Sequence, residues 1–251
     1  MPERPARRQK LSEAAHSSHP IHAPLGDDSV AELIEALQIR PGDRVVDVGC
    51  GSGEWLLRIA ATTGTAGLGI DSSRAAIRLA RSRAAAVEPR PAFQLLDAAR
   101  WQPANLFDRA LCVGSSQALG GLEATLRRGH ELLEPSGLLL LGEAFWQAPP
   151  TPAALAALGV GPTDMPDLAE LLTRIEEHGY SVVQQVISRP AEWDEYETRW
   201  CDGALEFAAA NPHDPDADWI RRAALSHRDA YLRGYRGVLG FMTAVLVATT
   251  T

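Results

Sequence analysis

The chain has 251 residues, 45% of them hydrophobic, which is enough for one sizeable core and favours one domain with a subdomain. Its formal net charge of −8 argues against a broad nucleic-acid surface. Lys10 is the only lysine and lies in a polar leading segment, so a Schiff-base lysine enzyme and a Walker A phosphate loop are both excluded.

The cysteine pattern and the leading segment bear on the compartment. Cys50, Cys112 and Cys201 are far apart, which indicates reduced thiols in a cytosolic protein rather than disulfides or a zinc site. The basic start is followed by no apolar segment, so we expect no signal peptide. No apolar run approaches the ~18 residues of a membrane span. We therefore expect a cytoplasmic protein without a membrane partner.

The chain alternates between strand and helix patterns. Residues 1–26, polar and rich in Pro and His, predict a flexible arm with a short helix. Helical spacing follows, with Ser29 as a capping residue for the first helix, and Pro149, Pro150 and Pro152 mark a loop. The predicted helices cover 28–38, 54–61, 72–85, 119–133 and 167–178, then about 191–210 and 215–235. The predicted strands cover 44–48, 67–70, 92–96, 107–113, 138–141, 180–187 and 238–248.

This order predicts an α/β fold. Strands that alternate with helices form right-handed crossovers and a doubly wound, Rossmann-like parallel sheet. We expect one domain over residues 27–251, with a helical cap inserted at about 190–236 before the last strand.

The most informative segment is a glycine-rich turn directly after the first strand. The strand residues Val45–Val48 run into Gly49, Gly51 and Gly53, and a helix pattern follows. Glycine allows bare backbone to approach a ligand at the carboxyl edge of a sheet. Cys50, within this turn, is interpreted as a small filler. A plain tight turn is the alternative, which the spacing of three glycines disfavours.

Two acidic residues end the next strands. Asp71 follows the second strand, where a carboxylate can accept hydrogen bonds from both ribose hydroxyls, with Ser72 beside it. Asp97 follows the third strand and can accept from an exocyclic amine, while the N–H of Ala98 donates to the ring. A helix cap at Asp71 and a loop carboxylate at Asp97 are the structural alternatives.

These motifs together resemble those of the class I S-adenosylmethionine-dependent methyltransferases, over roughly residues 30–147. The resemblance is closest to the small-molecule branch, and it implies a seven-stranded sheet with the last strand antiparallel. It implies S-adenosyl-L-methionine as the cofactor, with Asp47 near the methionine amino group and the glycines beside the methionine portion. Asp71 would bind ribose and Asp97 adenine, and Gly114 and Ser115 would flank the sulfonium.

A dinucleotide-binding enzyme is the competing interpretation. Its fingerprint is G-x-G-x-x-G, whereas this turn reads G-x-G-x-G and is followed by Glu54. An acid at the helix start is unfavourable for a pyrophosphate. The end of the fourth strand, Val113-Gly114-Ser115-Ser116, also lacks the carboxylate of metal-dependent catechol-type enzymes and the Asn/Asp-Pro-Pro-aromatic run of DNA amino-methylating enzymes. This favours a metal-free reaction on a small-molecule acceptor.

Candidate acceptor-binding and catalytic residues come later in the chain. Trp193, Tyr196 and Trp200 share one face of a predicted helix and, with Trp146, are candidates for the acceptor pocket, although the same stripe can simply pack the cap. Glu143 and His19 are candidate proton acceptors; a solvated carboxylate and a disordered arm are the alternatives.

Three other functions remain open at this level: a non-catalytic S-adenosylmethionine-binding regulator, an RNA methyltransferase and a protein methyltransferase. The acidic charge disfavours RNA. The sequence leaves the oligomeric state and the attacking atom (O, N, C or S) undefined.

Overall fold

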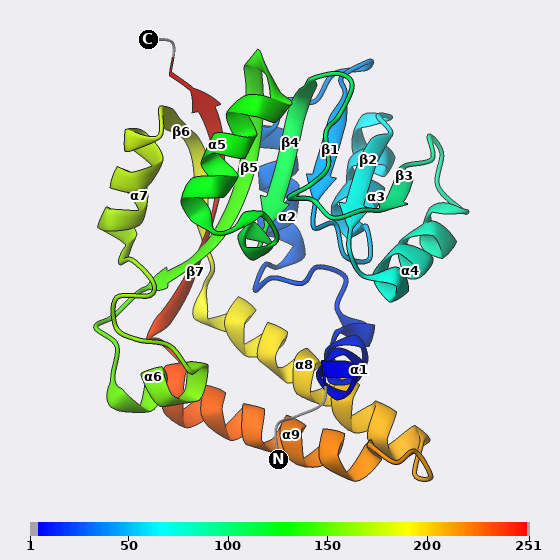
Figure 1. The fold of residues 1–251 in the computed structure, drawn as a ribbon, viewed down its shortest axis with the longest axis vertical. Coiled ribbons are helices and arrows are strands. Elements are labelled where there is room, and N and C mark those ends of the chain that lie inside the picture. The colour runs from blue at the N-terminus through cyan, green and yellow to red at the C-terminus, as the bar shows by residue number, and fades with distance from the viewer. Residues whose placement is uncertain (1–4, 250–251) are drawn as a thin grey trace. The chain divides into compact units, whose positions relative to one another are not determined.

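The computed structural model describes residues 5–249 and divides into two compact units (Figure 1). We call them the sheet unit, residues 26–145, 166–187 and 241 onward, and the helical unit, the described part of residues 1–25 with 146–165 and 188–240. The chain therefore passes from one unit to the other several times.

Seven strands form one sheet in the order β3-β2-β1-β4-β5-β7-β6. Strands β1 to β5 pair in parallel, and β7 runs antiparallel to β6. This confirms the predicted Rossmann-like sheet with its last strand antiparallel. The strands are β1 (Val45–Val48), β2 (Gly67–Asp71), β3 (Ala92–Leu95), β4 (Phe107–Val113), β5 (Leu133–Trp146), β6 (Tyr180–Ile187) and β7 (Leu239–Ala248).

Helices cover both faces of the sheet within the sheet unit. In the view of Figure 1, α5 lies in front of the strands, α2 lies behind them and α7 lies at the β6 edge. The core between these layers is apolar, with Ile70, Leu126, Leu141 and Leu246 fully buried. The helices are α2 (Asp27–Ala36), α3 (Glu54–Thr63), α4 (Arg74–Ala84), α5 (Leu122–Leu132) and α7 (Leu168–Glu177).

The helical unit is built from α1 (Pro5–Ala15), α6 (Pro152–Leu158), α8 (Pro190–Ala210) and α9 (Ala217–Ala230). A 3-10 turn, His16–Ser18, follows α1, and a π-helical turn, Tyr231–Tyr235, follows α9. Small residues let these helices approach closely, and the core of α1, α8 and α9 is mostly alanine. A Cβ on Gly234 would lie 2.8 Å from the Cβ of Ala157 on α6.

Several predicted elements differ from the observed ones. Ser29 does not cap α2; it is buried inside the helix, whose N-cap is Gly26. The prolines after β5 do not leave only a loop, because Thr151 caps α6 and Pro152 occupies its first turn, where proline is favoured. Strand β5 extends well beyond the predicted 138–141, and α5 starts later than predicted because a 3-10 turn, Ser116–Leu119, comes before it.

The described part of the leading segment is more regular than the sequence suggests. An eleven-residue helix, α1, contacts α8 within the helical unit, where the sequence predicts a flexible arm with a short helix. The predicted helical cap at about 190–236 corresponds to α8, α9 and the π-helical turn.

Candidate functional site

The turn after β1 requires its glycines. Gly49, Gly51 and Gly53 have φ angles of +74°, +52° and +81°, a region that side chains disfavour. Space is also absent: a Cβ on Gly49 would lie 2.4 Å from the Cβ of Ser115, and one on Gly53 would lie 2.5 Å from the Phe93 ring. The turn is therefore a tightly enclosed cradle of bare backbone at the carboxyl edge of the sheet.

The carboxylate of Asp71 fixes this turn from the neighbouring strand. One oxygen accepts from the N–H of Gly51 at 2.9 Å, and the other accepts from the N–H of Ser73 at 2.7 Å. Ser73, rather than Ser72, caps α4 by accepting from the N–H of Ala76 at 3.2 Å. A carboxylate has about four lone-pair sites, so Asp71 keeps acceptor capacity for a ligand hydroxyl.

Asp47, in β1 just before the turn, is a buried titratable group. It is 2% exposed, and its Oδ2 has no hydrogen-bond partner. Burial, and then the nearby charge of Asp71, raise the pKa of Asp47 to about 8. A buried carboxyl group without a partner is stabilised by a cation placed beside it, such as an ammonium group.

The third strand end supplies Asp97 and Ala98. Asp97 is exposed and its Oδ1 accepts from the N–H of Ala99 at 3.0 Å, while Ala98 is 6% exposed. The N–H of Leu96 donates to the backbone oxygen of Asp71 at 3.0 Å, which ties the ends of β2 and β3 together.

Ser115 and Cys50 have structural contacts. The Ser115 hydroxyl donates to the backbone oxygen of Val48 at 2.7 Å and lies 3.3 Å from the sulfur of Cys112. Gly114, with φ +66°, donates to the backbone oxygen of Gly142 at 3.0 Å. Cys50 is 7% exposed, and burial raises the pKa of its thiol strongly, as expected for a small filler rather than a nucleophile.

Glu143, on β5, carries a second buried carboxyl oxygen without a partner, its Oε1. Burial raises the pKa of Glu143 to about 7; a hydrogen bond from Ser116 opposes this shift and the charge of Glu123 adds to it. Val113, the last residue of β4, pairs with Gly142 in the sheet, so Glu143 lies within β5 at the level where β4 ends. A carboxyl group with this pKa can exchange a proton near neutral pH.

Glu54 does not leave a free acid at the start of α3. It forms ion pairs with Arg58 at 2.7 Å and with Arg83, and Arg83 also donates to the Ser52 hydroxyl at 3.1 Å. The charge of Glu54 at the helix start is therefore neutralised. The G-x-G-x-G spacing of the glycines, rather than this acid, disfavours a pyrophosphate ligand.

In the helical unit, both ring nitrogens of His19 face backbone oxygens, Nδ1 that of Ala15 at 3.3 Å and Nε2 that of Tyr196 at 2.8 Å. No third direction is left for a substrate proton. By contrast, the Nδ1 of His16 is buried and has no partner. The sequence offered no way to choose between these two histidines.

The four candidate pocket aromatics lie in different surroundings within the helical unit. Trp200 stacks on His227 with ring centroids 3.9 Å apart and packs against the helical core. The indole N–H of Trp146 donates to the backbone oxygen of Pro162 at 3.1 Å. Trp193 is 9% exposed, its N–H has no partner, and its ring meets that of Tyr196 edge-on at 6.2 Å. Of the four, Trp193 is the one with an unsatisfied buried polar atom, and Tyr196 is its ring neighbour.

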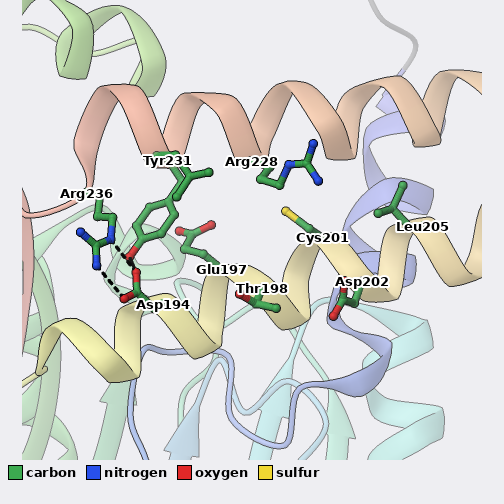
Figure 2. A pocket seen from close by; sticks show the side chains of 10 residues that line it. Asp194, Glu197, Thr198, Cys201, Asp202, Leu205, Arg228, Tyr231 and Arg236 are labelled. Atoms are coloured by element: carbon green, nitrogen blue, oxygen red, sulfur yellow. Dashed lines mark hydrogen bonds and ion pairs between the residues drawn. The ribbon is translucent and has the colours of Figure 1, made fainter.

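A cavity of about 570 Å3 between α8 and α9 was not predicted (Figure 2). Several of its polar side chains are paired: Arg236 donates to both oxygens of Asp194 at 2.7 and 2.8 Å, and the Tyr231 hydroxyl donates to the same carboxylate. Glu197 accepts from the Tyr235 hydroxyl at 2.8 Å and lies 2.6 Å from His227. These pairs join residues 30 or more positions apart, which no local pattern reveals.

Within residues 5–249, no group of three or more His, Cys, Asp and Glu side chains is arranged to hold a metal ion. None of the helices in this part of the chain has the length and apolar character required to cross a membrane.

Comparison with known proteins identifies relatives over nearly the whole chain. Residues 45–137 match a family described as a methyltransferase domain. The uncharacterized protein YjhP of Escherichia coli is 33% identical over 93% of this chain and 96% of its own length. The 27-O-demethylrifamycin SV methyltransferase of Amycolatopsis mediterranei is 30% identical over 76% of this chain and 68% of its own.

Solved structures agree with these relatives. A SAM-dependent methyltransferase from Thiobacillus denitrificans, in complex with S-adenosyl-L-homocysteine, is 35% identical with a TM-score of 0.88, covering 94% of this chain and 97% of that one. One from Geobacter sulfurreducens, also with S-adenosyl-L-homocysteine, is 31% identical with a TM-score of 0.90, covering 95% and 98%.

Proposed function

Because this chain belongs to the class I S-adenosylmethionine-dependent methyltransferases, we propose that it methylates a small organic acceptor without a metal ion. The observation that carries the proposal is Glu143, a buried carboxyl with an unpartnered oxygen at the same sheet edge as the glycine turn. Among the relatives, the one named for 27-O-demethylrifamycin SV supports an acceptor of small-molecule size.

The glycine turn and its neighbours fit the cofactor. The orphaned oxygen of Asp47 suits the methionine ammonium, and the turn at Gly49 and Gly53, packed too closely for a Cβ, presents bare backbone that a ligand can approach. Asp71 is assigned to the ribose hydroxyls and Asp97, with Ala98, to the adenine. When bound, S-adenosyl-L-methionine supplies a methyl group on a sulfonium, ready for in-line displacement.

The remaining work of the chain is to align the acceptor and to manage its proton. Alignment and exclusion of water account for much of the acceleration in such transfers. Glu143 is assigned to accept the proton of the acceptor's attacking group, because about half of its population is ionised near pH 7. Gly114 and Ser115 occupy the end of β4, where a metal-dependent enzyme of the catechol type needs a carboxylate.

Within the helical unit, Trp193 and Tyr196 are proposed as aromatic contacts of the acceptor. Trp200 and Trp146, although predicted as pocket residues, have contacts that suit packing better. Replacing Trp200 by alanine separates these roles: loss of acceptor binding with cofactor affinity kept indicates a pocket wall, whereas equal loss of both indicates packing.

The test is a release assay for S-adenosylhomocysteine over a panel of hydroxyl, amine, thiol and activated-carbon acceptors, with and without EDTA. We expect turnover of at least one small acceptor at a rate that EDTA leaves unchanged. Calorimetry with S-adenosylmethionine and with NADH provides the cofactor control, and only the former should bind. Turnover restricted to RNA or protein, or abolished by EDTA, would contradict the proposal.

A further inference from the structure

Within the helical unit, helix α1 packs closely against α8 at Gly203. Gly203 lies inside α8, where glycine destabilises a helix by about 1 kcal/mol relative to alanine. A Cβ at this position would lie 2.7 Å from the backbone oxygen of Ala14 and 2.8 Å from that of Ala15. The glycine therefore serves the close approach of α1.

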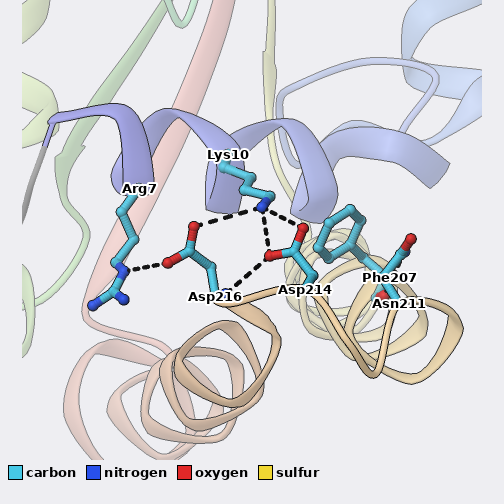
Figure 3. A network of polar contacts seen from close by, with 6 residues as sticks. All are labelled: Arg7, Lys10, Phe207, Asn211, Asp214 and Asp216. Carbon is cyan, nitrogen blue, oxygen red and sulfur yellow. Dashed lines mark hydrogen bonds and ion pairs between the residues drawn. The ribbon is translucent and has the colours of Figure 1, made fainter.

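Ion pairs hold the same helix at the other end (Figure 3). Arg7 bonds Asp216 at 2.7 Å, and Lys10 bonds Asp214 at 2.5 Å. The two cations also lie over aromatic rings, Arg7 over Trp219 at 5.2 Å and Lys10 over Phe207 at 5.7 Å. Helix α1 thus has a defined position on α8, and so has the turn that follows it.

His16, in that turn, and His19, directly after it, both lie near the ring of Tyr196. The ring of His16 stacks on that of His22 at 4.4 Å and lies 6.3 Å from the ring of Tyr196. The ring of His19 lies 4.8 Å from that of Tyr196, and the ring of Trp193 meets that of Tyr196 edge-on at 6.2 Å. The result is a wall of five rings drawn from α8 and from the segment after α1.

Two polar atoms in this wall have no partner, the Nδ1 of His16 and the Nε1 of Trp193. A buried polar atom without a hydrogen bond lowers stability by about 1–3 kcal/mol, so binding of a ligand that forms the missing hydrogen bond is favoured. The indole nitrogen can only donate, whereas a neutral imidazole nitrogen accepts or donates according to its tautomer.

The His16 ring is neutral under ordinary conditions. Burial, and then the neighbouring His22, His19 and His227, lower the pKa of His16 to about 3. An uncharged ring does not attract an anion, and Glu197, the α8 carboxylate whose charge reaches His19, is engaged by His227 and Tyr235. The wall is therefore suited to a neutral ligand.

We propose that His16, together with Trp193, binds a neutral hydroxyl group carried on an aromatic or conjugated methyl acceptor. A hydroxyl both donates and accepts, so it can satisfy either orphaned atom, while the rings contact the apolar body of the ligand. This inference rests on the proposed function. In this inference His16 replaces His19 as the histidine that contacts the acceptor, because both ring nitrogens of His19 already face backbone oxygens.

The test uses two compounds that differ only in the hydroxyl, β-naphthol and its methyl ether. Each is titrated by calorimetry into the full chain saturated with S-adenosylhomocysteine. We expect the naphthol to bind about tenfold more tightly than the ether, as one hydrogen bond provides. In His16→Phe, which retains a ring beside His22, the preference should fall to about twofold with little change for the ether.

A second variant and a control keep the test decisive. His16→Asn retains an acceptor near the position of Nδ1 and should preserve part of the preference, and His213→Phe changes an exposed histidine of the same unit and should preserve all of it. Equal binding of the two compounds, or a preference that survives in His16→Phe, overturns the inference. Methyl transfer is scored separately: a hydroxyl preference without turnover of any panel acceptor overturns the proposed function and leaves the hydroxyl site standing.

Discussion

In the sheet unit, Asp71 is held by the N–H groups of Gly51 and Ser73, whereas in the helical unit His16 is positioned by a helix whose anchors lie about 200 residues away in sequence. Backbone groups of adjacent strand ends build the first arrangement, so a change there alters the geometry of the cradle itself. Side-chain contacts between distant helices build the second, so a change there alters whether the arrangement forms. Cofactor binding and acceptor binding should therefore respond to different mutations.

The largest effect is expected at Gly49. Alanine there adds a disfavoured positive φ and an overlap with Ser115, together about 4 kcal/mol, or roughly 1000-fold in cofactor affinity. The matched control is Gly64→Ala, where φ is +67° but nothing lies within 4 Å of the added Cβ. Calorimetry with S-adenosylmethionine should show the loss in the first variant only. Similar affinities for the two variants would show that the cradle is not the binding element.

Glu143→Gln should lower kcat by about 100-fold, the range of a lost general base. The wild-type rate should fall as the pH drops below about 7, because the protonated carboxyl cannot accept a proton, and the variant should lose this dependence. Glu123→Gln removes a nearby charge and weakens a partly exposed ion pair with Arg174, so it should shift the acidic limb to lower pH with kcat unchanged. A pH profile that Glu143→Gln leaves intact would assign the proton to another group.

Asp47→Asn should change the pH dependence of stability. The pKa of Asp47 is raised to about 8 in the fold, so its contribution is complete at low pH, below the pKa of an ordinary carboxyl, and is lost as the pH rises through about 8. Urea unfolding of the ligand-free protein at pH 5, 7 and 9 should show a smaller decline in the variant. An equal decline in both proteins would indicate that Asp47 is ionised throughout.

The smallest effect is expected at the seat of α1. Gly203→Ala favours α8 by about 1 kcal/mol but should displace α1, so trypsin should cleave faster after Arg7, Arg8 or Lys10. Lys10→Gln, which breaks only a partly exposed ion pair, should weaken the seat by at most about 1 kcal/mol. Cofactor affinity should stay unchanged in both, and a loss there would show that the two units are energetically coupled.

The sequence predicted the sheet and the glycine turn because both depend on local signals. Apolar runs marked β1 and β4, and glycine spacing with a strand-end acid marked the turn and Asp71. The sequence did not predict helix α6, because three prolines at and before its start suggested a loop. Thr151 and Pro152 together form a helix start. His16 could not be distinguished from His19, because only the folded structure shows which ring nitrogen lacks a partner.

On the proposed assignment of Asp47 to the methionine ammonium, cofactor binding should release a proton. At neutral pH this group is largely protonated in the ligand-free protein, and an ammonium placed beside it lowers its pKa, so the proton leaves as the ligand enters. The binding enthalpy should then vary with the ionisation enthalpy of the buffer, and the apparent affinity for S-adenosylmethionine should strengthen from pH 6 toward pH 8. The pH of the solution should therefore determine how tightly the glycine turn and Asp47 hold S-adenosylmethionine.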